Sequence, residues 1–474
     1  MAQRYWLETL GCPKNQVDSD KLAGLLESQG YGLARRADQA DLVVVNTCAF
    51  IEAAREESIG TVLELAATKK QGAKLVVTGC MAERYGDELA AALPEVDRVA
   101  GFGVPVDFGR TRLVRSGIAA GVPARARSAG ALSASALSAG APLANARSAG
   151  ARSAGALSAN DPAPGRALPS FDLLNLPRPP ARAPWAYVKI AEGCDRHCGF
   201  CAIPSFRGPQ RSRTAPDILA EVDALGAAEV VLVAQDLVSW GRDVTGGAAA
   251  KSPEAGLVPL FREVAKRVDR VRLLYLYPSG LSQELIEAVG TSGCPYFDLS
   301  LQHVSRPLLR RMRRFGDGER FLRKISSIRR SFPDAALRSS FIIGYPGETE
   351  EDHDALLRFL EEAQLDWVGF FAFSKEDGTY AAGLPEQVPS SLVVERTKEC
   401  SELQDAITAS TRSGLVGTTC QVLVDAPGTA RSHREAPEID GVIHVPRDLE
   451  VGSWVEARIV EAEGPDLVAV PVAA

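Results

Sequence analysis

Residues Lys189 to Cys201 have the sequence KIAEGCDRHCGFC. Its three thiols, Cys194, Cys198 and Cys201, follow the spacing C-x3-C-x2-C. A structural [4Fe-4S] cluster takes four protein thiolates, so three thiolates leave one iron open to an external ligand. The spacing therefore predicts a reactive iron–sulfur site rather than a purely structural one.

Two simpler interpretations compete with this one. Free cysteine is often a small buried apolar residue, but three of them at this spacing are improbable by chance. Zinc is the stronger rival, since His197 would complete a Cys3His set; however, His197 directly precedes Cys198, and adjacent residues rarely reach one tetrahedron. The spacing resembles the radical S-adenosylmethionine (SAM) motif, in which SAM occupies the open iron, and Phe200 before the last cysteine also fits that family.

Length and composition set the broad class. A chain of 474 residues is long enough for two or three domains. Its hydrophobic fraction of 46% and charged fraction of 24% are ordinary for a globular protein. Nine cysteines, an odd number, argue against a secreted disulfide scaffold. No apolar leader or membrane-length stretch stands out, so we expect a cytoplasmic protein with no membrane partner.

The first region, residues 1–115, alternates strand and helix patterns. Strands are expected at Tyr5–Leu10, Asp41–Asn46 and Lys74–Thr78, with helices beginning near Asp18 and Ile51. Short Val- and Leu-rich runs of this kind are typical of strands buried in parallel sheets. The alternation predicts an α/β domain with a doubly wound parallel sheet.

A cysteine follows each of these three strands, namely Cys12, Cys48 and Cys80. Open parallel sheets bind ligands beyond the carboxyl ends of their strands. We therefore expect the three thiols to converge at one edge of the sheet and to form a second three-cysteine site. Three unrelated buried cysteines remain the alternative.

The composition changes sharply over residues 116–183. Within it, the stretch 124–160 is rich in Ala and Ser and has no acidic residue, and Ser recurs at a period of five. That period matches neither helix nor strand, so no face can stay apolar. We interpret this region as a flexible low-complexity linker. An electrostatic tether to RNA is a weaker alternative, because it rests on four arginines.

Strand and helix patterns resume over residues 184–411. Six strands are expected, at Tyr187–Ile190, Glu229–Ala234, Arg270–Tyr275, Phe297–Leu301, Leu337–Ile343 and Trp367–Phe373. Six such units predict a partial, TIM-like (β/α)6 barrel, whose active site belongs at the carboxyl ends of the strands. The cysteine motif follows the first of these strands, and Thr349 is the expected cap of a helix over Glu350–Ala363.

Residues 412–474 change character again. Val-rich alternation broken by Gly and Pro predicts a small antiparallel β-barrel. From residue 413 onwards the tail has ten acidic and four basic side chains. Glu435, Glu438, Asp440 and Asp448 are expected in loops between strands, where they would attract a basic partner. A solvated acidic surface is the alternative.

A family resemblance rests on four stretches: GCPKNQVDS from Gly11, NTC ending at Cys48, TGC ending at Cys80, and the segment from Glu192 to Gly208. Together they closely resemble the methylthiotransferases, and the resemblance covers the whole chain except the linker. It implies an auxiliary-cluster domain, a radical SAM barrel and a C-terminal TRAM barrel. The Ala/Ser-rich insert departs from the usual pattern.

Within that family, CPKN at Cys12, AQD from Ala234, LYLYP from Leu274 and LQHVS from Leu301 look like the branch that methylthiolates an aspartate of ribosomal protein uS12. The resemblance implies two [4Fe-4S] clusters and no catalytic side chain beyond their ligands. The implied ligands are Cys12, Cys48 and Cys80 for one cluster and Cys194, Cys198 and Cys201 for the other. The implied SAM contacts are Gln235, Asp236, Ser300, Gln302, Ile342 and Gly344.

The implied substrate dictates the chemistry. An aspartate β-hydrogen is not acidic enough for an ordinary side-chain base, so replacing C–H by C–S calls for hydrogen-atom abstraction by a radical that the cofactor supplies. The resemblance also implies a second SAM that methylates the sulfur, a sulfur donor, and a flavodoxin- or ferredoxin-type reductant. The implied protein partner is uS12, free or in the small subunit, bound through the acidic C-terminal domain.

Two other functions stay open. One is methylthiolation of a tRNA adenosine; the acidic tail argues against it, because a domain that grips tRNA needs a positive surface for phosphates. The other is a non-catalytic electron-transfer protein with two clusters. Such proteins usually complete each ligand set with four thiols, and a SAM-sized barrel would then have no role.

Overall fold

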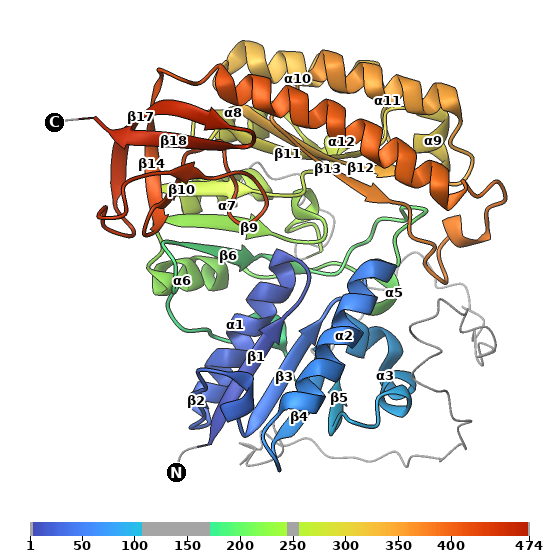
Figure 1. Ribbon diagram of the computed structural model, residues 1–474, viewed down its shortest axis with the longest axis vertical. Helices are drawn as coiled ribbons and strands as arrows, with labels where there is room; N and C mark the ends of the chain where they lie inside the picture. Colours follow the sequence, from blue (N-terminus) through green and yellow to red (C-terminus); the bar gives the residue numbers. More distant parts are fainter. Residues whose placement is uncertain (1–2, 107–170, 244–255, 473–474) are drawn as a thin grey trace, which may run out of the picture. The chain divides into compact units, whose positions relative to one another are not determined.

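The computed structural model describes residues 3–106, 171–243 and 256–472 (Figure 1). The chain divides into two compact units. Unit 1 comprises Met1–Gly11, Lys21–Ala49 and Ala53–Leu176. Unit 2 comprises Cys12–Asp20, Phe50–Glu52 and Pro177–Ala474. The expected linker lies outside the described residues as far as residue 170.

Unit 1 contains a five-stranded sheet in which every pairing is parallel. The strands, in the order β2-β1-β3-β4-β5, are β2 (Gly32–Leu33), β1 (Arg4–Thr9), β3 (Leu42–Thr47), β4 (Lys74–Gly79) and β5 (Arg98–Ala100). The three strands expected from the sequence are confirmed. The two short edge strands were not expected, since runs of two and three residues carry too little pattern.

Helices connect these strands: α1 (Pro13–Ser28), α2 (Glu52–Thr68) and α3 (Cys80–Ala92), with a short 3-10 turn η1 (Ala37–Gln39) between β2 and β3. A second 3-10 turn, η2 (Leu173–Asn175), follows β5 in the chain. The first helix begins at Pro13, earlier than the expected start near Asp18. Proline suits the first position of a helix because its missing N–H has no partner there. Leu22 and Leu26 of α1 pack with alternate residues Leu42 and Val44 of β3 and so cover one face of the sheet.

Unit 2 contains the six expected parallel strands of a partial barrel. They are β6 (Trp185–Lys189), β9 (Glu229–Val233), β10 (Arg270–Leu273), β11 (Tyr296–Gln302), β12 (Ala336–Ile343) and β13 (Trp367–Ala372). The ladders run β10-β9-β6 and β11-β12-β13, and a parallel bridge between Leu276 and Leu299 connects the two. This arrangement confirms the predicted (β/α)6 barrel.

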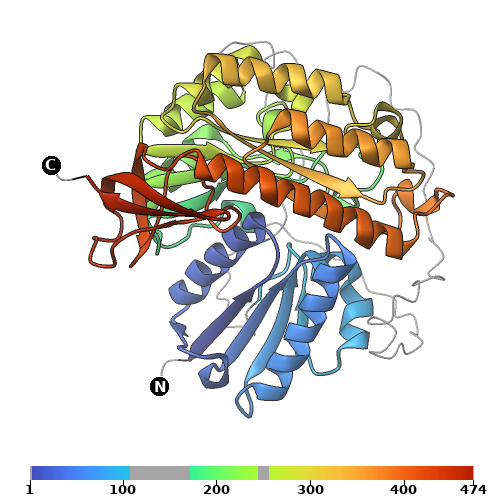
Figure 2. The same ribbon diagram turned by 45° about the horizontal axis from the view of Figure 1, so that its top comes forward.

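Helices cover the outside of these strands (Figures 1 and 2). They are α6 (Ala215–Leu225), α7 (Leu257–Ala265), α8 (Gln283–Gly290), α9 (Arg306–Arg311), α10 (Gly318–Ser331), α11 (Glu350–Ala363) and α12 (Ser390–Ser413). The short helix α5 (Ile203–Arg207) instead directly follows the cysteine motif. Val230 and Leu232 of β9 pack outward against these helices, whereas Val231 and Val233 face the inside of the barrel. Thr349 caps α11 as expected, in a capping box with Asp352.

The C-terminal barrel is closed by five strands in the order β14-β15-β16-β18-β17. They are β14 (Thr419–Ala426), β15 (Thr429–Arg431), β16 (Ile443–His444), β17 (Trp454–Glu463) and β18 (Asp466–Pro471). Four of the pairings are antiparallel, as expected, while β16 and β18 run parallel. No helix within the described residues is both long enough and apolar enough to span a membrane.

The segment between β15 and β16 packs against the amino-terminal end of the partial barrel. Tyr187 Oη donates to the Pro437 carbonyl at 3.0 Å, and Arg272 Nη1 donates to the His433 carbonyl at 2.9 Å. Trp367 Nε1 donates to the Arg434 carbonyl at 2.7 Å. Strand side chains from three places in the barrel thus bind backbone carbonyls of this one segment.

The expectation that Glu435 and Asp440 lie in exposed recognition loops is wrong. Glu435 is fully buried and pairs with Arg412. The Asp440 carboxylate, also buried, accepts hydrogen bonds from Tyr296 Oη at 2.5 Å and Arg338 Nε at 3.3 Å. The physical reason is that buried guanidiniums require counter-charges. Glu438 and Asp448 are exposed, as expected.

Candidate active site

The cysteine loop begins where β6 ends. The short strands β7 (Ala191–Glu192) and β8 (Arg211–Ser212) pair in an antiparallel sense and close the base of the loop. Inside this base, Cys194 N donates to the Gly208 carbonyl at 3.0 Å. Gly193 has φ +77°, and a Cβ there would stand 2.3 Å from the Pro209 carbonyl oxygen. Only glycine therefore permits the closure that presents Cys194.

The second half of the loop is anchored to the carboxyl ends of later barrel units. Gly199 N donates to the Met312 carbonyl at 2.8 Å, and Ala381 N donates to the Gly199 carbonyl at 2.8 Å. Met312 follows α9, which comes after β11, and Ala381 comes after β13. The sequence places the motif at this end of the barrel, and the contacts confirm that placement.

The thiol groups lie partly buried in a basic setting. Burial raises the pKa of Cys194 to about 11 and that of Cys201 to about 12. Arg196 N donates to Cys194 Sγ at 3.4 Å, and Arg314 Nη1 donates to Cys198 Sγ at 3.5 Å. Iron would deprotonate these thiols outright, because a coordinating thiol loses its proton. The two donors would then face thiolates, so the setting fits a cluster.

Zinc fits less well. Within the described residues, no three His, Cys, Asp or Glu side chains stand close enough together to hold one metal ion. A tetrahedral zinc needs all its ligands within about 2.3 Å of a single centre. The cysteines of a [4Fe-4S] cluster bind different irons and stand further apart. The Cys3His alternative with His197 therefore finds no ready-made zinc site among the described residues.

A cavity of about 200 Å³ opens beside Cys198 and Cys201. Arg196, His197, Arg313 and Tyr380 are among its other lining residues. An open side next to two of the three thiols is what an external ligand of the fourth iron requires.

Two of the expected SAM contacts converge on the cysteine loop. Asp236, just after β9, forms an ion pair with Arg196 at 2.6 Å between Oδ2 and Nε. Gln235 Nε2 donates to Glu192 Oε1 at 2.8 Å. Both side chains thus tie the end of β9 to the loop that carries the thiols.

The other expected SAM contacts lie on β11 and at the end of β12. The Ser300 carbonyl accepts a hydrogen bond from Arg314, and Gln302 has φ +74° where the register with β12 shifts. Such a conformation is uncommon for a residue other than glycine and occurs often at ligand sites. Ile342 is buried. Gly344 has φ +79°, and a Cβ there would meet the Val393 side chain at 2.3 Å, so packing alone explains this glycine.

Three further residues, which are not among the expected cluster ligands or SAM contacts, complete the site. The guanidiniums of Arg196 and Arg314 lie 3.4 and 4.0 Å from the centre of the Tyr277 ring. Two cations against one ring make a rigid basic cluster next to the thiols. Tyr277 was detectable as a residue following β10, but a single arginine such as Arg314 carries no sequence signal.

A buried ionic network links the cysteine loop to the segment that carries Cys12. Arg207 Nη1 lies 2.7 Å from Glu192 Oε1, and Arg207 Nη2 donates to Asn15 Oδ1 at 2.7 Å. Lys189 pairs with Asp18 and with Glu192. Burial opposes ionisation of Glu192, but Arg207 and Lys189 hold its pKa well below the usual range. The network is therefore charged and mutually compensated.

Cys12 belongs to unit 2 together with this network. Burial opposes the thiolate form, yet Lys14 and Arg207 lower the pKa of Cys12 below its usual value. The Lys14 ammonium also lies 3.7 Å from the centre of the Tyr275 ring. Cys12 is thus a thiol predisposed to act as a metal ligand.

Cys48 and Cys80 belong to unit 1, where Cys48 follows β3 and Cys80 opens α3 directly after β4. Both are buried. Gly79 has φ +90°, and a Cβ there would stand 2.6 Å from the Thr47 carbonyl oxygen, so the two strand ends can approach closely only with glycine. The order β2-β1-β3-β4-β5 reverses direction between β1 and β3, and sheets of this order bind ligands beyond the carboxyl ends at that point.

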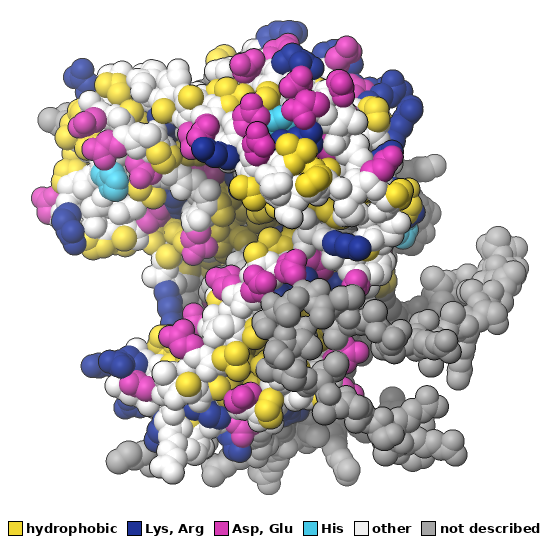
Figure 3. All heavy atoms as spheres, turned by 45° about the vertical axis from the view of Figure 1, so that its right-hand side comes forward, with side chains coloured by type: hydrophobic (Ala, Val, Ile, Leu, Met, Phe, Trp, Pro, Cys, Tyr) yellow, Lys and Arg dark blue, Asp and Glu magenta, His cyan; other side chains and the backbone are white. Residues whose placement is uncertain are grey.

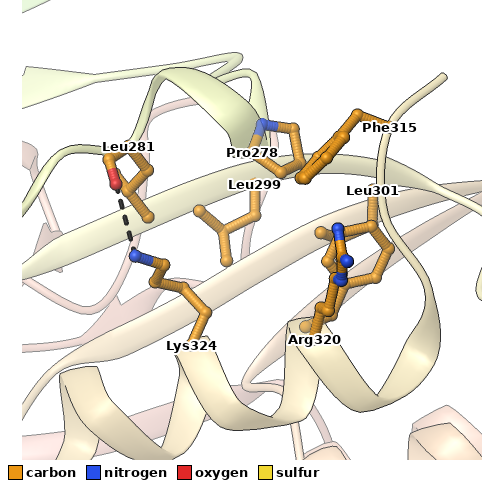
Figure 4. A pocket seen from close by; sticks show the side chains of 8 residues that line it. Pro278, Leu281, Leu299, Leu301, Phe315, Arg320 and Lys324 are labelled. Carbon is orange, nitrogen blue, oxygen red and sulfur yellow. Dashed lines mark hydrogen bonds between the residues drawn. The ribbon is translucent and has the colours of Figure 1, made fainter.

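A separate cavity of about 80 Å³ lies on the outer side of β11 (Figure 4). Leu299 and Leu301 face it from the strand, and Lys324 of α10 donates to the Leu281 carbonyl at 3.4 Å across it. Its lining is apolar apart from Arg320 and Lys324. This cavity suits packing between α10 and β11 rather than binding of a polar cofactor.

Three family models match the chain. They are described as Uncharacterized protein family UPF0004 at residues 4–101, Radical SAM superfamily at residues 188–360, and TRAM domain at residues 416–472. A Radical SAM domain implies a [4Fe-4S] cluster and SAM as cofactors. The matches confirm the expected N-terminal, radical SAM and TRAM domains.

Relatives cover nearly the whole chain. The ribosomal protein uS12 methylthiotransferase RimO of Moorella thermoacetica is 40% identical over 461 residues, which cover 96% of this chain and 95% of the relative. The RimO protein of Salinispora tropica is 42% identical over 517 residues, covering 99% and 95%.

Among solved structures, the radical SAM methyltransferase TsrM from Kitasatospora setae, with cobalamin and a [4Fe-4S] cluster bound, matches with a TM-score of 0.46 and 15% identity over 95% of this chain and 84% of that chain. The relatives named above are far more similar in sequence and nearly equal in length. By its sequence, the chain belongs to the family of ribosomal protein uS12 methylthiotransferases, RimO.

Proposed function

We propose that the protein converts an aspartate of ribosomal protein uS12 to 3-methylthioaspartate by radical replacement of C–H with C–S–CH3. The observation that carries this proposal is the buried network around Arg207, which ties the Cys12 segment to the loop with Cys194, Cys198 and Cys201. A methylthiotransferase needs a radical source and a sulfur source in fixed relation, and Arg207 contacts residues from both segments.

Cys194, Cys198 and Cys201 hold the radical SAM cluster in this proposal. When bound, this cluster and SAM together supply the one-electron cleavage that yields a hydrogen-abstracting radical. Arg196 and Arg314 donate to the thiolates and hold the loop against Tyr277. Gln235, Asp236, Ser300, Gln302, Ile342 and Gly344 are the proposed SAM contacts.

Cys12, Cys48 and Cys80 hold an auxiliary [4Fe-4S] cluster in the same proposal. Support comes from the reversal of strand order between β1 and β3, from the glycine at Gly79, and from the lowered pKa of Cys12. With three protein thiolates, this cluster too keeps an open iron, where the sulfur to be transferred can bind.

The partners follow from this chemistry. The substrate is uS12, free or in the small subunit, and the exposed carboxylates Glu438 and Asp448 of the C-terminal barrel are the proposed points of attraction for it. A sulfur donor must reload the auxiliary cluster, and a flavodoxin- or ferredoxin-type protein must supply electrons. The cytoplasm, where ribosomal proteins are made, is the proposed compartment.

Anaerobic reconstitution with iron, sulfide, SAM and dithionite tests the proposal. With uS12 present, we expect both 5′-deoxyadenosine and methylthiolated uS12. Methylthio-adenosine in added tRNA instead would assign the chain to tRNA modification. Absence of 5′-deoxyadenosine from a protein with both clusters loaded would favour a non-catalytic electron carrier.

A further inference from the structure

One segment of this acidic chain is strongly basic. Between residues 306 and 316 there are five arginines and no acidic residue, whereas the whole chain has a net charge of −7. The arginines are Arg306, Arg310, Arg311, Arg313 and Arg314. On the face of unit 2 that Figure 3 shows, acidic and basic side chains are interspersed. The function proposed above assigns a role to Arg314 alone.

This segment forms one wall of the cysteine loop. Gly199 N donates to the Met312 carbonyl at 2.8 Å. A Cβ on Gly199 would stand 3.0 Å from the Arg311 carbonyl oxygen, so the two backbones are in direct contact. Arg314 Nη1 reaches Cys198 Sγ at 3.5 Å. A protein bound to this segment is therefore close to the proposed cluster.

Three of the five arginines are not neutralised by an ion pair with any described residue. Arg311 pairs with Glu386 at 2.9 Å, and Arg314 is engaged with Cys198 and the Ser300 carbonyl. Arg306, Arg310 and Arg313 are exposed and form no ion pair with any described residue. Arg306 and Arg310 are four positions apart on α9 and thus share one face.

The surroundings of the third arginine are mixed. Arg313 lies 4.2 Å from the centre of the Tyr380 ring and lines the cavity beside Cys198 and Cys201. Asp377, also exposed, lines the same cavity. One carboxylate against three unpaired arginines leaves this edge basic. We call Arg306, Arg310 and Arg313 the basic edge.

We propose that the basic edge is the docking site of an acidic one-electron carrier protein that reduces the cluster on Cys194, Cys198 and Cys201. This inference rests on the proposed function and adds the place where its reductant binds. One electron leaves the carrier for each SAM cleaved, the carrier is oxidised by one electron, and no atom or proton is exchanged between the two proteins.

Charge and proximity favour an acidic electron-carrier protein over uS12 and over RNA as the partner that binds the basic edge. The exposed carboxylates Glu438 and Asp448 are the proposed points of attraction for uS12, so an edge of the opposite charge does not suit the same partner. Electron transfer needs the carrier next to the cluster, and the edge is continuous with the backbone that holds Gly199. Opposite charge mainly raises the association rate, and salt screens that effect. RNA, with its negatively charged phosphate backbone, is the competing binding partner. A comparison of two electron sources distinguishes RNA from the carrier protein.

The test compares two electron sources in the absence of uS12. The double variant Arg306→Glu with Arg310→Glu reverses the charge of the exposed face of α9 and leaves Arg313 and Arg314 in place. With a flavodoxin reduced by its NADPH-dependent reductase at low salt, we expect 5′-deoxyadenosine formation to fall about tenfold or more. With dithionite, which needs no protein docking, the rate should equal that of the unaltered protein.

A matched control reverses charge elsewhere: Arg262→Glu with Lys266→Glu, at exposed positions in α7 and directly after it. It should leave both rates unchanged. An unchanged flavodoxin-driven rate in the α9 variant would overturn the proposal. So would an equal loss with both reductants, and so would a loss of RNA binding with normal flavodoxin-driven cleavage. Failure of the proposed function is distinguishable in a parallel reaction to which uS12 is added, because uS12 would then stay unmodified with either reductant while SAM is still cleaved.

Discussion

Arg207 Nη2 donates a hydrogen bond to Asn15 Oδ1 at 2.7 Å, across 192 positions of sequence. Asn15 lies three residues after Cys12, and Arg207 closes the loop that carries Cys194, Cys198 and Cys201. Arg207 also binds Glu192 at 2.7 Å. A single guanidinium therefore fixes the first thiol of one proposed cluster relative to the loop of the other.

Replacing Arg207 by Lys should separate the two activities. Lysine keeps the positive charge but lacks the planar guanidinium whose separate N–H groups bind Asn15 and Glu192 at the same time. A displacement of about 1 Å between reacting groups costs up to about 100-fold in rate. We expect methylthiolation of uS12 to fall 10- to 100-fold by this argument, while 5′-deoxyadenosine formation changes less than about twofold.

The same variant should alter the electron paramagnetic resonance signal of the auxiliary cluster and leave that of the radical SAM cluster in place. Arg262→Lys, at an exposed arginine paired with exposed Glu284, is the control. Equal losses of both activities in Arg207→Lys would show that Arg207 merely stabilises the fold.

Substitution of a cysteine in each of the two triplets should remove a different activity. Cys198→Ala removes one of three thiolates of the radical SAM cluster, so SAM cleavage should be abolished. Cys48→Ala leaves that triplet intact, so 5′-deoxyadenosine should still form while methylthio product is absent. Chromatographic assay of both products from anaerobically reconstituted proteins checks this. If both variants lose both activities equally, the proposed division of labour is wrong.

Loss of the Glu435 charge should destabilise the protein. Glu435 is fully buried against Arg412 and accepts hydrogen bonds from Ser432 N and Oγ at 2.8 and 2.7 Å. Glu435→Gln would leave the buried guanidinium uncompensated, at a cost of about 3–5 kcal/mol in the free energy of unfolding. Urea denaturation followed by tryptophan fluorescence measures it; a change below about 1 kcal/mol would contradict the burial of this pair.

Substitution of exposed carboxylates in the C-terminal barrel should affect substrate binding rather than the free energy of unfolding. Glu438→Lys combined with Asp448→Lys changes surface charge, so we expect the free energy of unfolding to shift by less than about 1 kcal/mol in total. Binding to uS12 should weaken at low ionic strength and approach that of the unaltered protein at high salt. Affinity that does not change at any salt concentration would remove the C-terminal barrel from substrate recognition.

Glu229 should make the contact between the partial (β/α)6 barrel and the C-terminal barrel less stable at acidic pH. Burial opposes its ionisation, but Arg431, Arg272 and Arg270 lower the pKa of Glu229 from 4.5 to about 2. Arg272 Nε and Arg431 Nη1 lie 2.9 and 3.1 Å from its carboxylate oxygens. Because the pKa is lower in the folded state, the stabilisation is complete above pH 4.5 and is lost as pH falls toward 2.

Thermal unfolding between pH 6 and 3 checks this. Glu229→Gln should lower the melting temperature at neutral pH and show a shallower loss of stability below about pH 4.5 than the unaltered protein. Glu284→Gln, at an exposed carboxylate, is the control. Parallel pH profiles for Glu229→Gln and the unaltered protein would contradict the assignment.

The regular elements were predictable because their pattern is local. The six barrel strands are apolar runs between helical patterns, and Thr349 is followed three residues later by an acidic residue, so both could be identified from neighbouring residues. Strand β15, by contrast, spans only Thr429–Arg431 and ends in a charged residue. The division into 1–115, 116–183, 184–411 and 412–474 stays a prediction.

The long-range ionic contacts were not predictable. Glu435 and Asp440 stand among loop-forming residues, for which exposure is the normal expectation. Their burial depends on Arg412 and Arg338, which lie far away in the sequence and become neighbours only in the folded chain. Likewise, the roles of Arg207 and Arg314 depend on where long side chains end, which spacing in the sequence does not encode.

The mass of uS12 in cells depends directly on whether this protein methylthiolates it. Intact-mass spectrometry should compare uS12 from cells that carry this gene, cells that lack it, and cells that carry the Cys48→Ala form. We expect uS12 to bear one methylthio group on an aspartate in the first case and none in the other two. If uS12 has the same mass in all three, this protein does not methylthiolate uS12.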